Sequence, residues 1–190
     1  MEIKVRNITF SNEKSFVLIG GINVIENYES ALFAANHLKE VCSKLKINLV
    51  FKASYEKANR SSLKSYTGPG LKEGLKTLAR IKEELNIPII TDVHLPEEAV
   101  FASEVCEIIQ LPAFLARQTS LIKSMAKTNA VINIKKPQFL SPNQIFYIVE
   151  KFRELGKEDL LICERGSLFG YDNLIVDFLG IGIMKEICQN

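Results

Sequence analysis

An α/β fold with a parallel sheet is predicted for this chain, and two features of the sequence predict it. Short apolar runs recur along the chain, and each is continuous enough for a strand buried on both faces, as in parallel sheets. Segments with an apolar stripe of helical period separate these runs. Regular strand–helix alternation of this kind is typical of proteins in which helices cover a parallel sheet.

The predicted strands of the sheet are six apolar runs, at residues 16–19, 49–51, 87–93, 108–111, 131–134 and 160–163. Residues 1–6 precede them and alternate apolar with charged side chains. Such alternation predicts a short N-terminal strand or β-hairpin with one buried face.

Helices are predicted by apolar stripes between the strands. One stripe consists of Leu32, Ala35, Leu38, Val41 and Leu45, and another of Leu71, Leu75, Leu78 and Leu85. The clearest helix covers residues 141–156, where Ser141 suits the N-cap, Pro142 suits the first helical position and Gln144 completes a capping box. Gly156 supplies the left-handed residue that ends the helix.

The overall architecture follows from this alternation. Strict strand–helix repetition leaves an open doubly wound sheet or an eight-fold barrel. The Gly20-Gly21 pair after the first strand lacks the further glycine of a dinucleotide-binding turn, which favours the (β/α)8 TIM barrel. No linker-like stretch is present, so residues 1–190 are expected to form a single domain. A full barrel needs about 250 residues, so we expect about six βα units here and a barrel incomplete at its C-terminus.

Composition and charge exclude several classes of function. Hydrophobic residues make up 47% of the chain, yet no apolar run is long enough for a membrane helix or a signal peptide. A net charge of +2 is too small to predict nucleic-acid binding. The four cysteines, none in a C-x-x-C pair, are expected to be buried reduced thiols of a cytoplasmic protein; they are Cys42, Cys106, Cys163 and Cys188.

Cationic side chains recur where the predicted strands end, which is the edge at which such folds bind ligands. They are Lys52, Lys57, Arg60, Arg117, Lys135, Lys136 and Arg165. So many cations on one rim would repel one another unless anions bound there, and phosphates and carboxylates favour Arg and Lys. The sequence therefore predicts a rim that binds two anions, although any single lysine could be an ordinary surface charge.

One carboxylate, Asp92, stands at a strand end without an evident structural duty. It could orient a sugar hydroxyl or move a proton, or it could simply pair with a neighbouring lysine. His94 lies on the same side if the strand continues, but a structural role is equally compatible with its position. Neither a nucleophilic triad nor a cluster of protein metal ligands is evident.

Taken together, these motifs resemble one family. The segments that carry the resemblance lie in order along nearly the whole chain: residues 52–54, 57–62, 68–70, 89–94, 110–119 and 165–167, the second reading Lys57-Ala58-Asn59-Arg60-Ser61-Ser62. They resemble the 3-deoxy-D-manno-octulosonate-8-phosphate synthases. The resemblance implies a TIM-barrel transferase of the cytoplasm, a homotetramer, which condenses phosphoenolpyruvate with D-arabinose 5-phosphate and water for lipopolysaccharide biosynthesis.

The resemblance also implies roles for particular residues. Phosphoenolpyruvate would be held by Lys52, Gln110, Ala113, Lys135 and Arg165, and the sugar phosphate by Asn59, Arg60 and Ser61. Lys57 would lie between the substrates, and Asp92 would contact the reacting end of the sugar. Asn23 stands where metal-dependent members carry a cysteine ligand, so the chain is expected to need no metal.

Two alternatives remain open at this point. The related 3-deoxy-arabino-heptulosonate-7-phosphate synthases share the barrel and phosphoenolpyruvate, although residues 57–61 depart from the proline, arginine and threonine usual there. Members of the resembled family also continue through two further strands, whose ends carry a histidine, a glutamate and an aspartate of the site. The second alternative is therefore a non-catalytic remnant that binds anions.

Overall fold

The computed structural model describes residues 2–189, and the side chains among them up to residue 187. The chain begins with a hairpin of β1 (Glu2–Val5) and β2 (Ile8–Ser11), which pair antiparallel. Ile3, Val5 and Ile8 are its buried side chains, as the apolar–charged alternation predicts. The predicted N-terminal hairpin is confirmed for these residues, while Met1 lies outside the described part of the chain.

By their internal contacts, the described residues divide into two compact units. Residues 2–92 and 101–108 form the first unit, and residues 93–100 and 109–189 form the second. Two elements, α3 (Glu98–Val105) and β6 (Ile108–Leu111), contribute residues to both units. The single domain expected over residues 1–190 stays a prediction.

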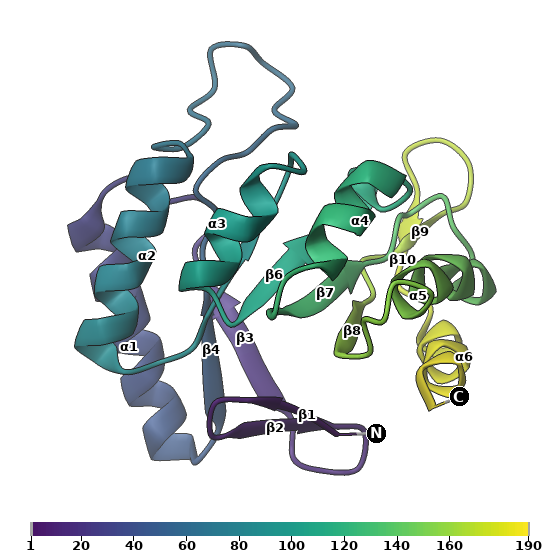
Figure 1. Cartoon of the computed structure of the whole chain (residues 1–190), viewed down its shortest axis with the longest axis horizontal. Coiled ribbons are helices and arrows are strands. Elements are labelled where there is room, and N and C mark those ends of the chain that lie inside the picture. The colour runs from purple at the N-terminus through teal and green to yellow at the C-terminus, as the bar shows by residue number, and fades with distance from the viewer. Residues whose placement is uncertain (1, 190) are drawn as a thin grey trace. The chain divides into compact units, whose positions relative to one another are not determined.

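The first unit contains three parallel strands and two helices. The strands are β3 (Val17–Gly21), β4 (Asn48–Lys52) and β5 (Ile89–Asp92). The helices α1 (Tyr28–Leu45) and α2 (Leu71–Leu85) pack side by side (Figure 1). Asn27 caps α1, because its side chain accepts a hydrogen bond of 2.8 Å from the Ser30 N–H.

The predicted apolar stripe of α2 is buried except at Leu71, which is half-buried, and that of α1 is only partly buried. In α2, Leu75, Leu78 and Leu85 are buried. In α1, the buried residues are Ala31, Ala35 and Cys42, while Leu45 is 63% exposed. The expected α1 stripe is therefore wrong in part, because the buried face of this helix consists of small side chains rather than leucines.

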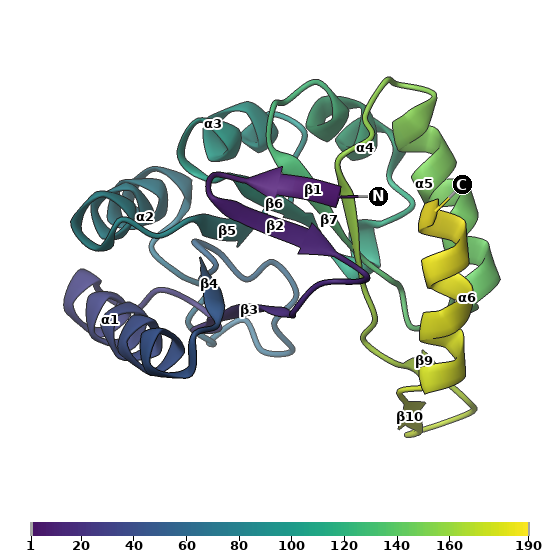
Figure 2. The same ribbon diagram turned by 90° about the horizontal axis from the view of Figure 1, so that it is seen from below.

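The second unit contains the remaining strands and helices. Its parallel strands β7 (Val131–Lys135) and β8 (Leu160–Cys163) pair with each other, and β9 (Ser167–Leu168) pairs antiparallel with β10 (Leu174–Ile175). Its helices are η1 (Ala113–Leu115), α4 (Thr119–Ala126), η2 (Pro142–Ile145), α5 (Phe146–Arg153) and α6 (Phe178–Gln189). Figure 2 shows α5 and α6 lying side by side.

The helix predicted at residues 141–156 is present with a tighter first turn, since η2 leads directly into α5. The Ser141 N–H donates to the Gln144 side chain at 3.1 Å, which is one half of the expected capping box. At the other end, Gly156 has a φ of +77° and the Lys157 N–H donates to the Phe152 carbonyl at 2.9 Å. The predicted cap and stop signals are confirmed, although α5 itself ends at Arg153.

The strand order of the six-stranded sheet follows the chain, from β3 to β8. A helix follows each strand from β3 to β7, and β9 and β10 come between β8 and α6. This order confirms the predicted α/β fold of about six βα units after an N-terminal hairpin. All six predicted strands are present, with ends that differ from the prediction by no more than a few residues. The carboxyl ends of parallel strands are the ligand-binding edge of such folds, so a functional site is expected there.

Two further predictions from composition concern cysteines and membranes. Cys42 and Cys106 are buried free thiols and Cys163 is half-buried, while the side chain of Cys188 lies outside the described residues. Burial raises the pKa of the Cys106 thiol. In the part of the chain that the structure describes, none of the helices has both the length and the apolarity to span a bilayer.

Candidate functional site

The first unit carries a compact polar cluster at the ends of β4 and β5, which we call the Asp92 cluster: Lys52, Ser54, Lys57 and Asp92. The Asp92 carboxylate lies 3.5 Å from the Lys52 ammonium and 3.4 Å from the Lys57 ammonium. The Ser54 hydroxyl donates to Asp92 and accepts from Lys57 at 2.7 Å. The parallel pairing of β4 with β5 explains this meeting, because it brings both carboxyl ends to one edge.

The accessibility of the cluster differs between its carboxylate and its ammonium groups. Ser54 and Asp92 are buried, whereas the side chains of Lys52 and Lys57 are 20% and 16% exposed. Within these four residues two ammonium groups lie around one carboxylate, and the lysine side chains that carry them are partly exposed. Asp92 therefore pairs with neighbouring lysines, which is one of the roles that the sequence left open. This pairing does not prevent Asp92 from contacting a ligand as well.

The Asn23 turn is held against the backbone of the same cluster. The Ile22 N–H donates to the Lys52 carbonyl at 3.0 Å, and the Ile25 N–H donates to the Ser54 carbonyl at 3.0 Å. Asn23 lies between these two anchors and is exposed. Gly21 permits this close approach, because a Cβ atom there would lie 1.9 Å from the Lys52 carbonyl oxygen.

The residues predicted to bind the sugar phosphate lie on the long connection between β4 and α2. Asn59, Arg60 and Ser61 are all exposed there. The base of this loop is fixed, because the Lys57 N–H donates to the Thr67 carbonyl at 2.7 Å. Figure 1 shows the loop extending beyond the end of α2. The structure thus brings Lys57 into the Asp92 cluster and leaves the other three side chains on the outer part of the loop.

The loop base depends on a glycine. Gly68 has a φ of +123°, and a Cβ atom at this position would lie 2.3 Å from the Tyr55 carbonyl oxygen. Only glycine satisfies both conditions. The Gly70 N–H then donates to the same Tyr55 carbonyl at 3.1 Å. These contacts give a physical reason for the glycine–proline–glycine motif found in the sequence.

In the second unit, Gln110 lies near the end of β6, and Ala113 begins η1 just after that strand. Gln110 is buried, and its side-chain carbonyl accepts a hydrogen bond of 3.1 Å from the Asn133 amide on β7. This bond fixes which way the Gln110 amide faces. Ala113 is buried at the first position of η1.

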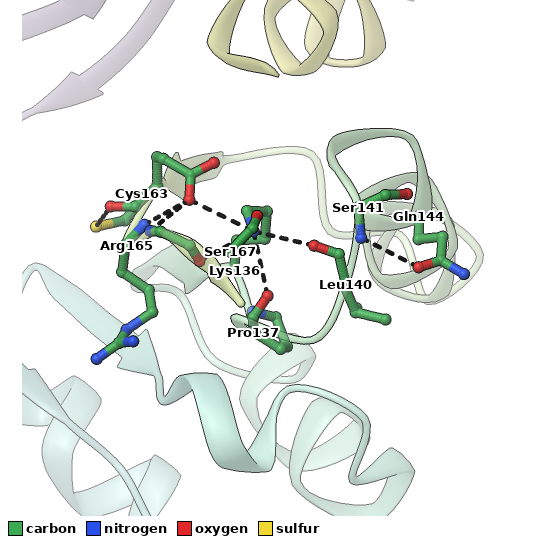
Figure 3. Close-up of polar contacts among 10 residues, drawn as sticks. Lys136, Pro137, Leu140, Ser141, Gln144, Cys163, Arg165 and Ser167 are labelled. Carbon is green, nitrogen blue, oxygen red and sulfur yellow. Dashed lines mark hydrogen bonds and ion pairs between the residues drawn. The ribbon is translucent and has the colours of Figure 1, made fainter. Parts of the chain in front are cut away.

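The two adjacent lysines at the end of β7 have different environments. Lys135 is half-buried, whereas Lys136 is completely buried and pairs with Glu164 at 3.4 Å (Figure 3). The inclusion of Lys136 among the rim cations is therefore wrong, because its ammonium group does not reach solvent. Arg165 follows Glu164 directly and is half-buried, and Arg117 is exposed. The wider ring of cations around one rim stays a prediction.

Sequence reasoning missed Ser54 and Glu164 as parts of these clusters. Ser54 lies two residues after Lys52, so in an extended segment both side chains project to the same side, and this spacing could have identified it. For a metal, the described residues bring no three histidine, cysteine, aspartate or glutamate side chains together. The expectation that no metal is needed stays a prediction.

Comparison with known proteins matches the whole chain to one family. A model of the DAHP synthetase I family matches residues 1–190. A protein of Prochlorococcus marinus (strain MIT 9313), named 2-dehydro-3-deoxyphosphooctonate aldolase, is 66% identical over 188 residues, which are 99% of this chain and 66% of that protein. Proteins of the same name from Parasynechococcus marenigrum (strain WH8102) and Pseudoalteromonas translucida (strain TAC 125) are 62% and 57% identical, over 100% and 96% of this chain and 67% and 64% of theirs. The chain spans about two thirds of the length of these curated relatives.

Proposed function

This chain belongs to the DAHP synthetase I family, and from that membership we propose that it serves the condensation of phosphoenolpyruvate with D-arabinose 5-phosphate and water. The products are 3-deoxy-D-manno-octulosonate 8-phosphate and phosphate. The predicted resemblance to octulosonate-phosphate synthases is confirmed by relatives named 2-dehydro-3-deoxyphosphooctonate aldolase. Their name also favours this reaction over that of the heptulosonate-phosphate synthases.

The observation that carries the proposal is the Asp92 cluster. Two partly exposed ammonium groups around one buried carboxylate form a positive site that an anionic substrate can reach. Their partner Ser54 offers a hydroxyl in the same place. A small phosphorylated substrate is attracted to the two ammonium groups, because it carries the opposite charge.

The substrates are assigned to residues by chemistry and by the family resemblance. By the family resemblance, phosphoenolpyruvate is assigned to Lys52, Gln110, Ala113, Lys135 and Arg165. The sugar phosphate is assigned to Asn59, Arg60 and Ser61, where Arg60 provides a charged fork and the other two provide neutral donors. Exposure of these three side chains supports the assignment, because a ligand that enters from solvent can reach them.

In the proposed reaction, C3 of phosphoenolpyruvate forms a bond with the aldehyde carbon of the sugar. Water adds to C2 of the same molecule, and phosphate leaves from the resulting tetrahedral intermediate. The cations hold two mutually repelling anions in register, and such positioning can lower a barrier by about 7–11 kcal/mol. Lys57 lies between the substrates and stabilises charge that develops there, while Asp92 orients the hydroxyl at the reacting end of the sugar.

Two accompanying properties belong to the same proposal. The reaction runs without a metal, since Asn23 is a poor substitute for a thiolate ligand. The protein acts in the cytoplasm as a homotetramer and takes no part in nucleic-acid or membrane binding. Buried free thiols at Cys42 and Cys106 support a reducing compartment.

The decisive experiment measures phosphate release by the purified chain from phosphoenolpyruvate with either arabinose 5-phosphate or erythrose 4-phosphate. We expect turnover with arabinose 5-phosphate that a chelator does not reduce. Turnover with erythrose 4-phosphate alone would assign the chain to the heptulosonate reaction. No turnover with either sugar, together with retained phosphoenolpyruvate binding, would favour the non-catalytic anion-binding remnant.

A further inference from the structure

Lys136 is the most completely enclosed charge in the second unit, and it stands beside a residue assigned to phosphoenolpyruvate. Its side chain is 0% exposed, whereas the preceding Lys135 is half-buried. The Lys136 N–H donates to the Cys163 carbonyl at 2.9 Å and so continues the β7–β8 ladder by one residue. Successive side chains of an extended strand point to opposite sides, so these two lysines cannot both serve one ligand.

The Lys136 ammonium group joins two loops that follow neighbouring strands. On the loop after β7 it donates to the carbonyls of Pro137 and Leu140, at 3.2 and 3.0 Å. On the loop after β8 it donates to the Ser167 hydroxyl at 3.0 Å and lies 3.4 Å from the Gly166 carbonyl. A buried ammonium needs this many partners, because an unpaired charge in the interior is very costly.

The carboxylate that pairs with Lys136 also fixes the backbone of Arg165. One oxygen of Glu164 lies 3.4 Å from the Lys136 ammonium and accepts the N–H groups of Arg165 and Gly166, at 2.8 and 2.7 Å. Gly166 has a φ of +93°, and a Cβ atom there would lie 2.8 Å from a methyl group of Leu174. The turn that carries Arg165 is therefore held by charge on one side and by close packing on the other.

The Arg165 side chain points to the opposite side of the turn from its own backbone contacts with Glu164 (Figure 3). Figure 3 shows it pointing away from the Lys136 ammonium, while its backbone nitrogen faces Glu164. The guanidinium group therefore extends from the turn on the side away from the Lys136–Glu164 pair, while Glu164 contacts the backbone of the same turn (Figure 3).

We propose that Lys136 and Glu164 are positioning residues, whose buried ion pair fixes the turn that presents Arg165 to the carboxylate or phosphate of phosphoenolpyruvate. This inference rests on the proposed function and deepens it. Lys136 contacts no substrate in this account and acts only through Arg165. The two neighbouring lysines then have different roles, since Lys135 contacts phosphoenolpyruvate and Lys136 holds the turn that carries Arg165.

The test compares binding of each substrate by calorimetric titration of the purified chain and three variants, Lys136→Met, Glu164→Gln and Arg165→Ala. We expect Lys136→Met to weaken phosphoenolpyruvate binding about tenfold or more, because small displacements of a ligand-binding group have large effects. Binding of arabinose 5-phosphate should stay unchanged. Glu164→Gln keeps an acceptor for the N–H groups of Arg165 and Gly166 and removes the negative charge. This variant therefore tests the positioning role if Lys136→Met does not fold.

A double-mutant cycle separates positioning from general destabilisation. Adding Glu164→Gln to Arg165→Ala should cause no further loss of phosphoenolpyruvate affinity, because the group being positioned is gone. The matched control is Lys157→Met, which removes another buried lysine of this unit whose ammonium donates to the Thr128 carbonyl at 3.0 Å. This control should leave affinity for phosphoenolpyruvate unchanged.

The outcomes distinguish the two proposals. Unchanged phosphoenolpyruvate affinity in Glu164→Gln, or full additivity with Arg165→Ala, would overturn the positioning role and leave the proposed function intact. Equal weakening by the Lys157→Met control would overturn it as well, because the effect would then be one of stability. Absence of phosphoenolpyruvate binding by the unsubstituted chain would overturn the proposed function, and this inference with it.

Discussion

Two ion-paired clusters, one in each unit, use the same residue types with opposite results. In the Asp92 cluster, two lysines surround one carboxylate, and their side chains are 20% and 16% exposed. In the second unit, one lysine meets one carboxylate, and Lys136 is 0% exposed. The first cluster places two ammonium groups around one carboxylate on partly exposed side chains, while the charges of the second neutralise each other inside the protein.

The comparison teaches that a cation at a strand end is not by itself a ligand-binding group. Whether such a cation can bind an anion depends on the charges around it and on whether its side chain reaches solvent. Lys52 and Lys57 meet both conditions for anion binding, and Lys136 meets neither. The same distinction predicts how substitutions in the two clusters divide between stability and binding.

The largest effect is expected from Lys136→Met, which leaves Glu164 charged and largely buried without its ammonium partner. Breaking a buried pair in this way costs about 3–5 kcal/mol of unfolding free energy. Chemical denaturation of the purified chain measures the loss, with Lys135→Met as the matched control at the neighbouring, half-buried position. Equal losses in the two variants would erase the proposed difference between the lysines.

A smaller loss of stability is expected from Asp92→Asn, because the ammonium groups it frees still reach solvent. Hydrogen bonds to a charged group contribute about 1.5–3 kcal/mol, and their loss sets the expected decrease in unfolding free energy. Inorganic phosphate should bind this variant more tightly than the unsubstituted chain at low salt, since the competing carboxylate is gone. Weaker phosphate binding by Asp92→Asn would contradict the proposal that the ammonium groups of the Asp92 cluster bind an anion.

The smallest effect on stability is expected from Arg60→Ala on the exposed loop. Surface substitutions of this kind usually change unfolding free energy by no more than about 0.5 kcal/mol. Binding of arabinose 5-phosphate should nevertheless weaken about tenfold or more, through loss of a charged fork to its phosphate. Titration with phosphoenolpyruvate is the control, and an equal loss for both ligands would remove the assignment of Arg60 to the sugar phosphate.

Much of the fold was predictable because local signals and tertiary structure agree. The capping residue Ser141 and the stop at Gly156 mark the helix that the structure contains. The apolar runs from β4 to β7 are strands whose continuous hydrophobicity matches burial on both faces, while most residues of β3 and β8, at the two ends of the strand order, are half-buried. For α1, periodicity predicted the buried face only in part, since Ala35 is buried as expected but Ala31 and Cys42 take the place of the leucines beside them.

The candidate site was predictable only to the extent that strand ends locate it. That rule correctly brought Lys52 and Asp92 together. It could not decide which of the adjacent residues Lys135 and Lys136 is buried, because alternation along a strand gives opposite sides without saying which side is inside. It also could not find Glu164 as a partner, since the pairing depends on two loops meeting in space.

The fixed base and exposed outer part of the β4–α2 connection have a consequence for proteolysis. Leu63 is fully exposed and Arg60 lies nearby, so a protease such as trypsin can reach this stretch. Both ends of a cut loop would stay attached, because the backbone bonds of Lys57 to Thr67 and of Gly70 to Tyr55 lie outside the cut. A nicked protein should therefore keep its fold and lose its hold on the sugar phosphate, and bound sugar phosphate should slow the cleavage.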